Sequence, residues 1–160
     1  SWSALGLYSD TAFDGFAFQG TNGYAAYIDS GTAGFINCLF SGNIGGSQAG
    51  AIYADYSTKV SVIHCTLIGN SAYDASSSGG NALYANWDAT LIIRNSILWN
   101  PSANNSFPEI EAPYATVSAA NSIIRGGQYG GIDQTPGLLS SRWMSANSPA
   151  RRVGAAGWSA

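Results

Sequence analysis

The chain has 160 residues, only 9% of them charged, and its formal net charge at pH 7 is −3. Helical bundles and coiled coils carry far more Glu, Lys, Leu and Arg on their faces, and six scattered basic residues do not form a nucleic-acid-binding surface. An aromatic content of 12% and the low net charge disfavour disorder. Glycine and asparagine recur throughout, which indicates short strands separated by tight turns.

A short, largely apolar stretch that ends in Gly or Asn occurs five times, with 22 to 30 residues between equivalent positions. The five copies lie at 15–20, 37–43, 64–70, 94–100 and 120–126. Between them lies a second motif of Ala with an aliphatic residue and Tyr, at 26–28, 51–53 and 82–84, with a degenerate copy at 109–111. The segments 44–49, 72–80 and 101–108 vary in length, as insertions do at one corner of a solenoid.

This period, with short strands and no helical pattern, predicts an all-β fold, a parallel β-helix of about five to six coils. Each repeat is expected to supply two short strands and two turns. A leucine-rich repeat has a similar period but requires Leu at fixed spacing, and this chain has too few. We expect residues 1–160 to form a single domain.

The alternation of side chains along a strand predicts which residues point inward. If Phe40, Leu67, Ile97 and Ile123 point inward, the residues two positions earlier form a second inner ladder. That ladder would contain Cys38, Cys65, Asn95 and Asn121. The two cysteines could form a disulfide, but parallel in-register neighbours suit that bond poorly, so we favour buried free thiols.

Residues 37–43, Asn-Cys-Leu-Phe-Ser-Gly-Asn, followed by Gly-Ala-Ile-Tyr at 50–53, resemble the polymorphic outer-membrane protein repeat. That repeat pairs a Gly-Gly-Ala-Ile element with a Phe-x-x-Asn element, which Phe40 and Asn43 match, although Ala49 stands where the family often has Gly. Residues 14–20 resemble a coil of the same right-handed parallel β-helix proteins of bacterial surfaces. Segments 132–136, 142–144 and 148–150, with Gly154, are similar to their terminating segment.

The resemblance implies a right-handed β-helix whose residues 127–160 form a C-terminal terminating segment. It also implies an extracellular or cell-surface location, with a signal peptide removed or upstream, because the first residues of this chain do not resemble one. The family includes adhesins, surface modules and polysaccharide lyases and hydrolases of the pectate-lyase type. The fold therefore does not choose among these functions.

Two outward rows are candidates for contact with a glycan or a protein partner. His64 is expected to point outward beside Arg94, and an aromatic row is expected to contain Tyr53, Tyr84 and either Tyr56 or Trp87. Exposed rings of this kind can stack on sugars. The alternative for the aromatic row is that its rings pack against loops. A further row of Asp29, Asp55 and Asp88 is out of register by one to three residues, so it does not predict ligand geometry. We predict no catalytic, cofactor or metal site.

These observations favour a non-catalytic extracellular or cell-surface module that acts in adhesion, surface display or self-association. The alternative is a carbohydrate-active β-helix of the lyase or hydrolase type, or a glycan-binding module. Nucleic acid is not expected as a partner, and no apolar run approaches the roughly 18 residues that span a membrane. Because no N-terminal cap is recognisable, we expect self-association through the first coil.

Overall fold

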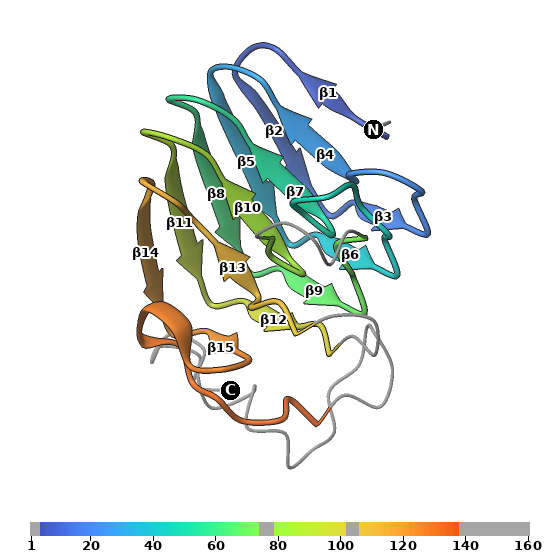
Figure 1. The fold of residues 1–160 in the computed structure, drawn as a ribbon, viewed down its shortest axis with the longest axis vertical. Helices are drawn as coiled ribbons and strands as arrows, with labels where there is room; N and C mark the ends of the chain where they lie inside the picture. The colour runs from blue at the N-terminus through green and yellow to red at the C-terminus, as the bar shows by residue number, and fades with distance from the viewer. Residues whose placement is uncertain (1–3, 74–78, 102–105, 138–160) are drawn as a thin grey trace.

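The computed structural model describes residues 4–73, 79–101 and 106–137. Its fifteen short strands form three parallel five-stranded sheets, and each sheet takes every third strand of the chain (Figure 1). One short 3-10 helix, η1 (Gln128–Gly130), follows the last strand of the described part. The predicted all-β fold, a parallel β-helix, is therefore confirmed.

We name the sheets by their first strands. The β1 sheet contains β1 (Gly6–Leu7), β4 (Ala26–Ile28), β7 (Ile52–Ala54), β10 (Leu83–Ala85) and β13 (Ile110–Glu111). The β2 sheet contains β2 (Thr11–Asp14), β5 (Thr32–Ile36), β8 (Lys59–Ile63), β11 (Thr90–Arg94) and β14 (Thr116–Ala120). The β3 sheet contains β3 (Ala17–Gln19), β6 (Leu39–Ser41), β9 (Thr66–Ile68), β12 (Ile97–Trp99) and β15 (Ile123–Ile124).

Each turn of the solenoid has three strands, so the prediction of two strands per repeat is wrong. The missed strands are those of the β2 sheet, which include the longest in the described part of the chain. Their sequences differ: Thr-Ala-Gly-Phe-Ile and Lys-Val-Ser-Val-Ile, for example, have only the final Ile in common. They share only two inward apolar positions, which are buried in β5, β8 and β11. Period-2 burial, rather than residue identity, defines this sheet.

The inner ladder that begins with Cys38 and Cys65 continues as Ser96 and Ser122, not as asparagine. The backbone N–H of Cys38 donates to Cys65 Sγ (3.4 Å) and that of Cys65 to Ser96 Oγ (3.1 Å). The N–H of Ser96 in turn donates to Ser122 Oγ (3.2 Å). Both cysteines are buried free thiols, and burial raises the pKa of Cys65 to about 12.

The predicted inward Asn95 and Asn121 instead occupy a turn between the β2 and β3 sheets. They align with Asn37 and His64, and all four residues have φ between 50° and 54°. This left-handed conformation is tolerated by asparagine better than by most residues. The error arose because Leu98 and Ile124, not Ile97 and Ile123, pair in register with the Phe40–Leu67 column.

A second buried ladder, made of asparagines, runs along the solenoid and ends at a carboxylate. The side chain of Asn43 donates to Asn70 Oδ1 (2.8 Å), and that of Asn70 to Asn100 Oδ1 (2.8 Å). Asn100 donates its Nδ2 to Glu109 Oε2 (2.6 Å). Arg125 Nε forms an ion pair with the other oxygen of Glu109 at 2.7 Å. Each turn thereby satisfies polar groups that the stack removes from water.

The two ends of the described solenoid differ. Near the C-terminal end, Gln128 Oε1 accepts from the N–H groups of Glu109 and Ile110 (3.0 Å each), so a side chain covers the edge of β13. Ile132 forms a bridge with Ile123. The other expected parts of the terminating segment, 142–144, 148–150 and Gly154, lie outside the described residues.

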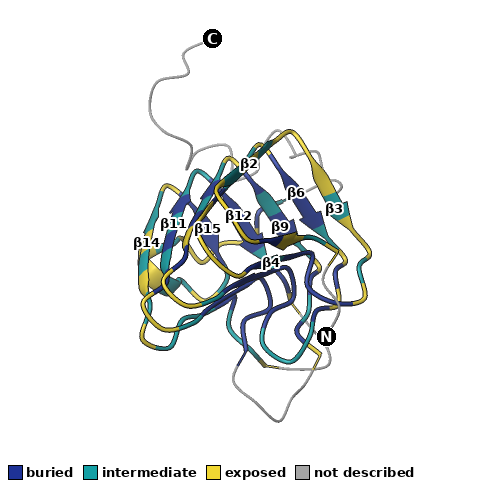
Figure 2. Cartoon of the chain, turned by 90° about the horizontal axis from the view of Figure 1, so that it is seen from above, coloured by how far each residue is buried: buried dark blue, intermediate teal, exposed yellow. Residues whose placement is uncertain are grey.

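At the N-terminal end, the outer edges of β1, β2 and β3 pair with no strand of the described part. The ring of Phe13 stacks on Phe35 (centroids 5.6 Å apart), and that of Phe18 stacks on Phe40 (4.7 Å). Both Phe13 and Phe18 are only partly buried, and Figure 2 shows exposed residues in β3 where β6 and β12 are buried. Within the described residues, this end of the core is therefore apolar, and no strand covers it.

Candidate functional site

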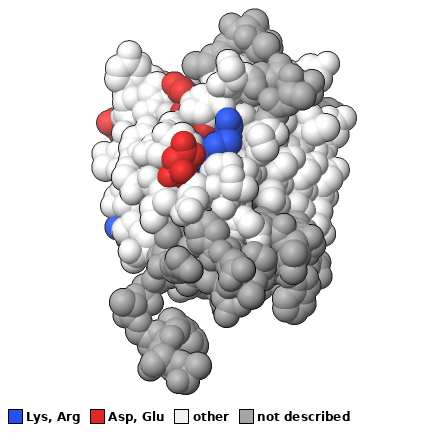
Figure 3. All heavy atoms as spheres, turned by 90° about the horizontal axis from the view of Figure 1, so that it is seen from below, with Lys and Arg blue, Asp and Glu red and all other residues white. Residues whose placement is uncertain are grey.

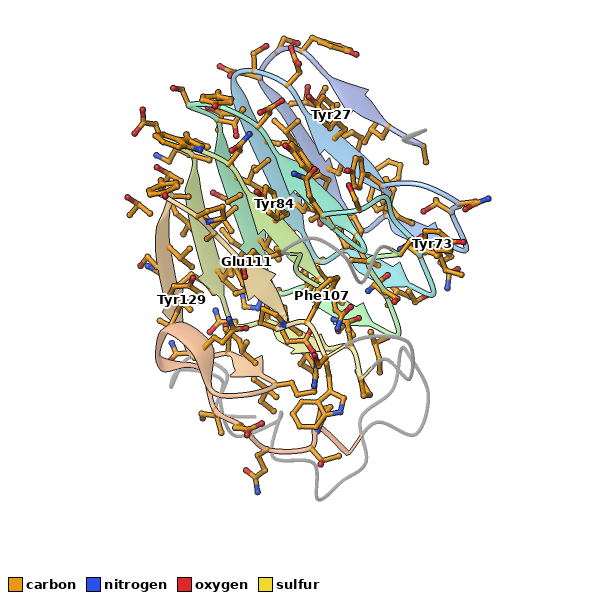
Figure 4. All side chains as sticks on the ribbon, in the orientation of Figure 1. Tyr27, Tyr73, Tyr84, Phe107, Glu111 and Tyr129 are labelled. Carbon is orange, nitrogen blue, oxygen red and sulfur yellow. The ribbon has the colours of Figure 1, made fainter. Side chains whose placement is uncertain are left out.

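A column of tyrosines lies on the outer face of the β1 sheet. Tyr27, Tyr53 and Tyr84 are in register, and Glu111 continues the column (Figure 4). The ring centroids are 5.1 Å apart between the first two tyrosines and 5.2 Å apart between the last two. Tyr53 is 7% exposed and Tyr84 is 6% exposed, so each ring buries most of its surface against its neighbours. These two predicted contact residues pack as part of the fold.

A hydrogen-bond network ties this column to Asp55. The Tyr27 hydroxyl donates to the Asp55 carboxylate, and Asn86 Nδ2 donates to both Tyr53 Oη (3.3 Å) and Asp55 Oδ1 (3.1 Å). The hydrogen bond to Asp55, followed by burial, raises the pKa of Tyr27 above its ordinary value. Burial, followed by the charge of Asp55, raises the pKa of Tyr53 to about 12. Both phenols therefore remain protonated at neutral pH.

Three exposed rings lie beside this face, in the turns that connect the β1 sheet to the β2 sheet. We call Tyr56, Trp87 and Tyr114 the aromatic corner. They are 59%, 48% and 72% exposed, respectively. Tyr56 and Trp87 each lie two residues beyond strand ends that pair in register, and the rings of Trp87 and Tyr114 lie 4.2 Å apart at an angle of 36°. Trp87 is thus the predicted aromatic contact residue whose ring is open to solvent.

Tyr114 joins this corner through an unusual backbone conformation. Its φ is 62°, whereas the residues at the same left-handed position in the two preceding turns are Ser57 (φ 55°) and Asp88 (φ 58°). Counted between residues in register, the path from Glu111 to Thr116 is one residue shorter than the equivalent paths of the two preceding turns. A bulky residue with positive φ is uncommon, and such strain costs on the order of 1–3 kcal/mol. Tyr114 lies three residues after Glu111, as Trp87 does after Tyr84, and sequence comparison missed it because Glu111 stands in place of the repeated tyrosine.

The three aspartates of the predicted acidic row, Asp29, Asp55 and Asp88, do not occupy equivalent positions. Asp29 and Asp55 each follow directly on residues that pair in register, Ile28 and Ala54, whereas Asp88 lies at the left-handed position further along its turn. The carboxylate of Asp55 is occupied by Tyr27, Asn86 and the N–H of Tyr56. Within residues 4–73, 79–101 and 106–137, no group of three His, Cys, Asp or Glu side chains has the arrangement of a metal site.

His64 and Arg94 do not form the single row that we predicted. His64 is exposed and lines a groove of about 310 Å³ together with Asn37, Leu39 and Thr66. Its neighbour in the next turn is Asn95, whose Nδ2 lies 3.5 Å from His64 Nε2. Arg94 pairs in register with Ile63 and Ala120 instead.

The guanidinium of Arg94 is engaged by the strand beside it. Its Nη1 donates to the carbonyl oxygen of Ser118 (2.8 Å), and its Nη2 donates to Ser118 Oγ (2.9 Å). These contacts hold the side chain along the outer face of the β2 sheet, so Arg94 stabilises the pairing of β11 with β14.

No protein-family model, curated protein or solved structure matches the chain. Within the described residues, no helix has the length and apolar character needed to cross a membrane. The candidate surface must therefore be judged from its own chemistry. Figure 3 shows one face of the molecule, on which uncharged atoms predominate and charged side chains are few.

Proposed function

We propose that this solenoid is a non-catalytic binding module of an extracellular or cell-surface protein, and that it contacts its partner through the aromatic corner. We also propose that the chain is related to the polymorphic outer-membrane protein repeat and to the pectate-lyase-like β-helices that its sequence resembles. Its role would be adhesion, surface display or self-association. The alternative is a carbohydrate-active β-helix that uses the same surface.

The exposure of three large rings on a stacked backbone carries this proposal. Trp and Tyr provide a large contact area and lose few rotamers on binding. Tyr56 and Trp87 are held on adjacent turns whose flanking strands are paired on both sides. The carboxylate of Asp55, which precedes Tyr56 in the chain, accepts hydrogen bonds from Tyr27, Tyr56 and Asn86. This arrangement favours binding over proton transfer to a substrate.

Replacing Trp87 with alanine is expected to weaken binding of the fluorescently labelled chain to immobilised glycans and matrix proteins at least tenfold, because the central ring of the corner is lost. Tyr73→Ala is the matched control, since Tyr73 is 79% exposed and lies outside the corner. It should leave the binding pattern unchanged. Equal binding by wild type and Trp87→Ala would contradict the proposed contact surface.

Catalysis can be tested separately with a panel of acidic and neutral polysaccharides. The expected result is no turnover, either as absorbance of unsaturated products at 235 nm or as release of reducing ends. Turnover that is abolished by His64→Asn would favour the carbohydrate-active alternative. Asparagine is a suitable replacement because three other turns carry it at this left-handed position.

A second part of the proposal is self-association through the N-terminal end. Phe16 is 54% exposed, and its ring lies 5.6 Å from that of Phe13, at the end where β1, β2 and β3 each have one edge that pairs with no described strand. Sedimentation is expected to show dimers or larger species of wild type and monomers of Phe16→Lys. Tyr73→Lys is the control for added charge. A strictly monomeric wild-type chain would exclude this contact.

A further inference from the structure

We propose that the aromatic corner binds an amino-sugar chain whose ammonium groups face the carboxylates around the rings, with β-1,4-linked glucosamine as the representative ligand. This inference rests on the binding role proposed above and names the ligand class of that surface.

The exposed area of the corner suits a narrow ligand better than a folded protein. A fully buried aromatic side chain covers roughly 150–250 Å², so three rings that are between 48% and 72% exposed offer roughly 300 Å². Stable protein interfaces need about 800 Å² from each partner. Polar residues, Ser57 and Asp88, lie within the same turns and interrupt the apolar surface. A single extended chain fits this strip.

The rings lie in successive turns of the solenoid, along the direction of an extended ligand. Tyr56 and Trp87 lie in adjacent turns, which places their backbones about 4.8 Å apart along the solenoid. The ring of Tyr114 follows at 4.2 Å from that of Trp87. A pyranose presents a face of C–H groups that packs on an aromatic ring, with hydroxyls at its edge. Because the rings of Trp87 and Tyr114 pack against one another, they offer one joint aromatic contact, and Tyr56 offers another in the adjacent turn.

The charge of this corner selects the kind of sugar. Four carboxylates lie in the turns between the β1 and β2 sheets. Among the described residues of these turns and of the adjoining strand ends, Lys59 is the one basic residue. The carboxylates belong to Asp10, Asp29, Asp55 and Asp88. Asp29 and Asp88 are exposed, and within the described residues their carboxylates have no hydrogen-bond or ion-pair partner.

Carboxylates and aromatic faces both attract ammonium groups, and Trp is the strongest aromatic partner for a cation. The same carboxylates repel uronic acids. The corner is therefore complementary to a cationic sugar chain.

The strained conformation of Tyr114 is consistent with a binding role. The two turns before it place Ser57 and Asp88 at the left-handed position, and both residue types suit a turn better than tyrosine does. The fold therefore does not require an aromatic residue there. The substitution Tyr114→Asn relieves the strain, so it removes the ring without a loss of stability.

Titration calorimetry with three hexasaccharides of equal length tests the inference: glucosamine hexamer, N-acetylglucosamine hexamer and galacturonate hexamer. In mildly acidic, low-salt buffer, glucosamine hexamer is expected to bind at least tenfold more tightly than its acetylated counterpart. Galacturonate hexamer should bind weakest. Added salt should reduce the affinity for glucosamine hexamer and barely change that for N-acetylglucosamine hexamer, because salt screens the attraction between charges.

Three variants separate charge, stacking and stability. Asp88→Asn is expected to reduce the preference for glucosamine hexamer about threefold or more, whereas Asp14→Asn, which removes one charge at a different corner, should not change it. Trp87→Ala should lower affinity at least tenfold. Tyr114→Asn should weaken binding while the melting temperature stays equal or rises.

Equal affinity for the acetylated and free hexamers, or preference for galacturonate, would overturn the assignment to amino sugars. If Trp87→Ala still abolished binding to other immobilised partners, the proposed function would stand and only the ligand class would fall. If Trp87→Ala left all binding unchanged, the contact surface itself would be wrong. A basic protein bound through the corner in place of glucosamine would also overturn the inference.

Discussion

Replacing Glu109 with glutamine is expected to lower the free energy of unfolding by about 3–5 kcal/mol, the usual cost of removing one partner of a buried ion pair. The Glu109 side chain is fully buried. Its Oε1 accepts from the backbone N–H of Asn100 (2.8 Å) and from Arg125 Nε (2.7 Å), and its Oε2 accepts from Asn100 Nδ2 (2.6 Å).

The direction of the asparagine ladder explains why glutamine cannot replace this residue. Every amide in the ladder donates toward the C-terminal end, from Asn43 to Asn70 to Asn100. The last residue must therefore accept from two donors of Asn100 and from Arg125, and a carboxylate supplies two oxygens for them. Glutamine supplies one oxygen and turns an NH₂ group toward a donor, which leaves polar groups unpaired in the core.

Urea denaturation of Glu109→Gln measures this effect, and Glu111→Gln is the matched control. Glu111 lies two residues further along the chain, in β13, on the outer face of the sheet and is only partly buried. Its replacement should change the free energy of unfolding by no more than about 0.5 kcal/mol. Equal stability of the two variants would show that the ladder does not depend on its terminal carboxylate.

The repeat pattern predicted the fold class because a stacked solenoid requires similar residues at equivalent places in each turn. It failed where different residues satisfy the same geometry. Cys65 and Ser96 both place a small side chain inward and accept one backbone hydrogen bond, so the inner ladder continues through a change of residue type. Alignment on the left-handed residue, His64 or Asn95, would have given the correct register.

The candidate surface was only partly predictable from the sequence, because the exposure of a side chain depends on its neighbours in other turns. Trp87 was identified from its position near a repeated Tyr motif, but the sequence does not reveal that Tyr53 and Tyr84 bury each other. Exposure depends on how closely neighbouring turns pack, which no single repeat encodes. Tyr114 was missed because Glu111 replaces the repeated tyrosine in its turn. The role of Glu109 depends on Asn100 and Arg125, which lie elsewhere in the repeat.

Replacing Gly50 with alanine is expected to destabilise the fold by more than about 4 kcal/mol, or to prevent folding. A Cβ atom at Gly50 would lie 1.9 Å from the carbonyl oxygen of Asn81 and 2.8 Å from the backbone nitrogen of Ser71. Neither atom can move aside easily. The backbone N–H of Asn81 is bonded to Pro108 and that of Ser71 to Asn43. The glycine of the Gly-Ala-Ile-Tyr motif is therefore required by the close approach of the next turn.

Gly34→Ala is the matched control for this substitution, since the same methyl group at Gly34 would meet only ordinary contact, 3.6 Å from the Cβ of Ala12. Its effect should be within about 1 kcal/mol and toward greater stability, because alanine reduces the entropy of the unfolded chain. Thermal unfolding of both variants measures the difference. A folded Gly50→Ala chain with wild-type stability would mean that the turns can separate at this corner. The stacking that holds the aromatic rings in one row would then be looser than the register of the strands implies.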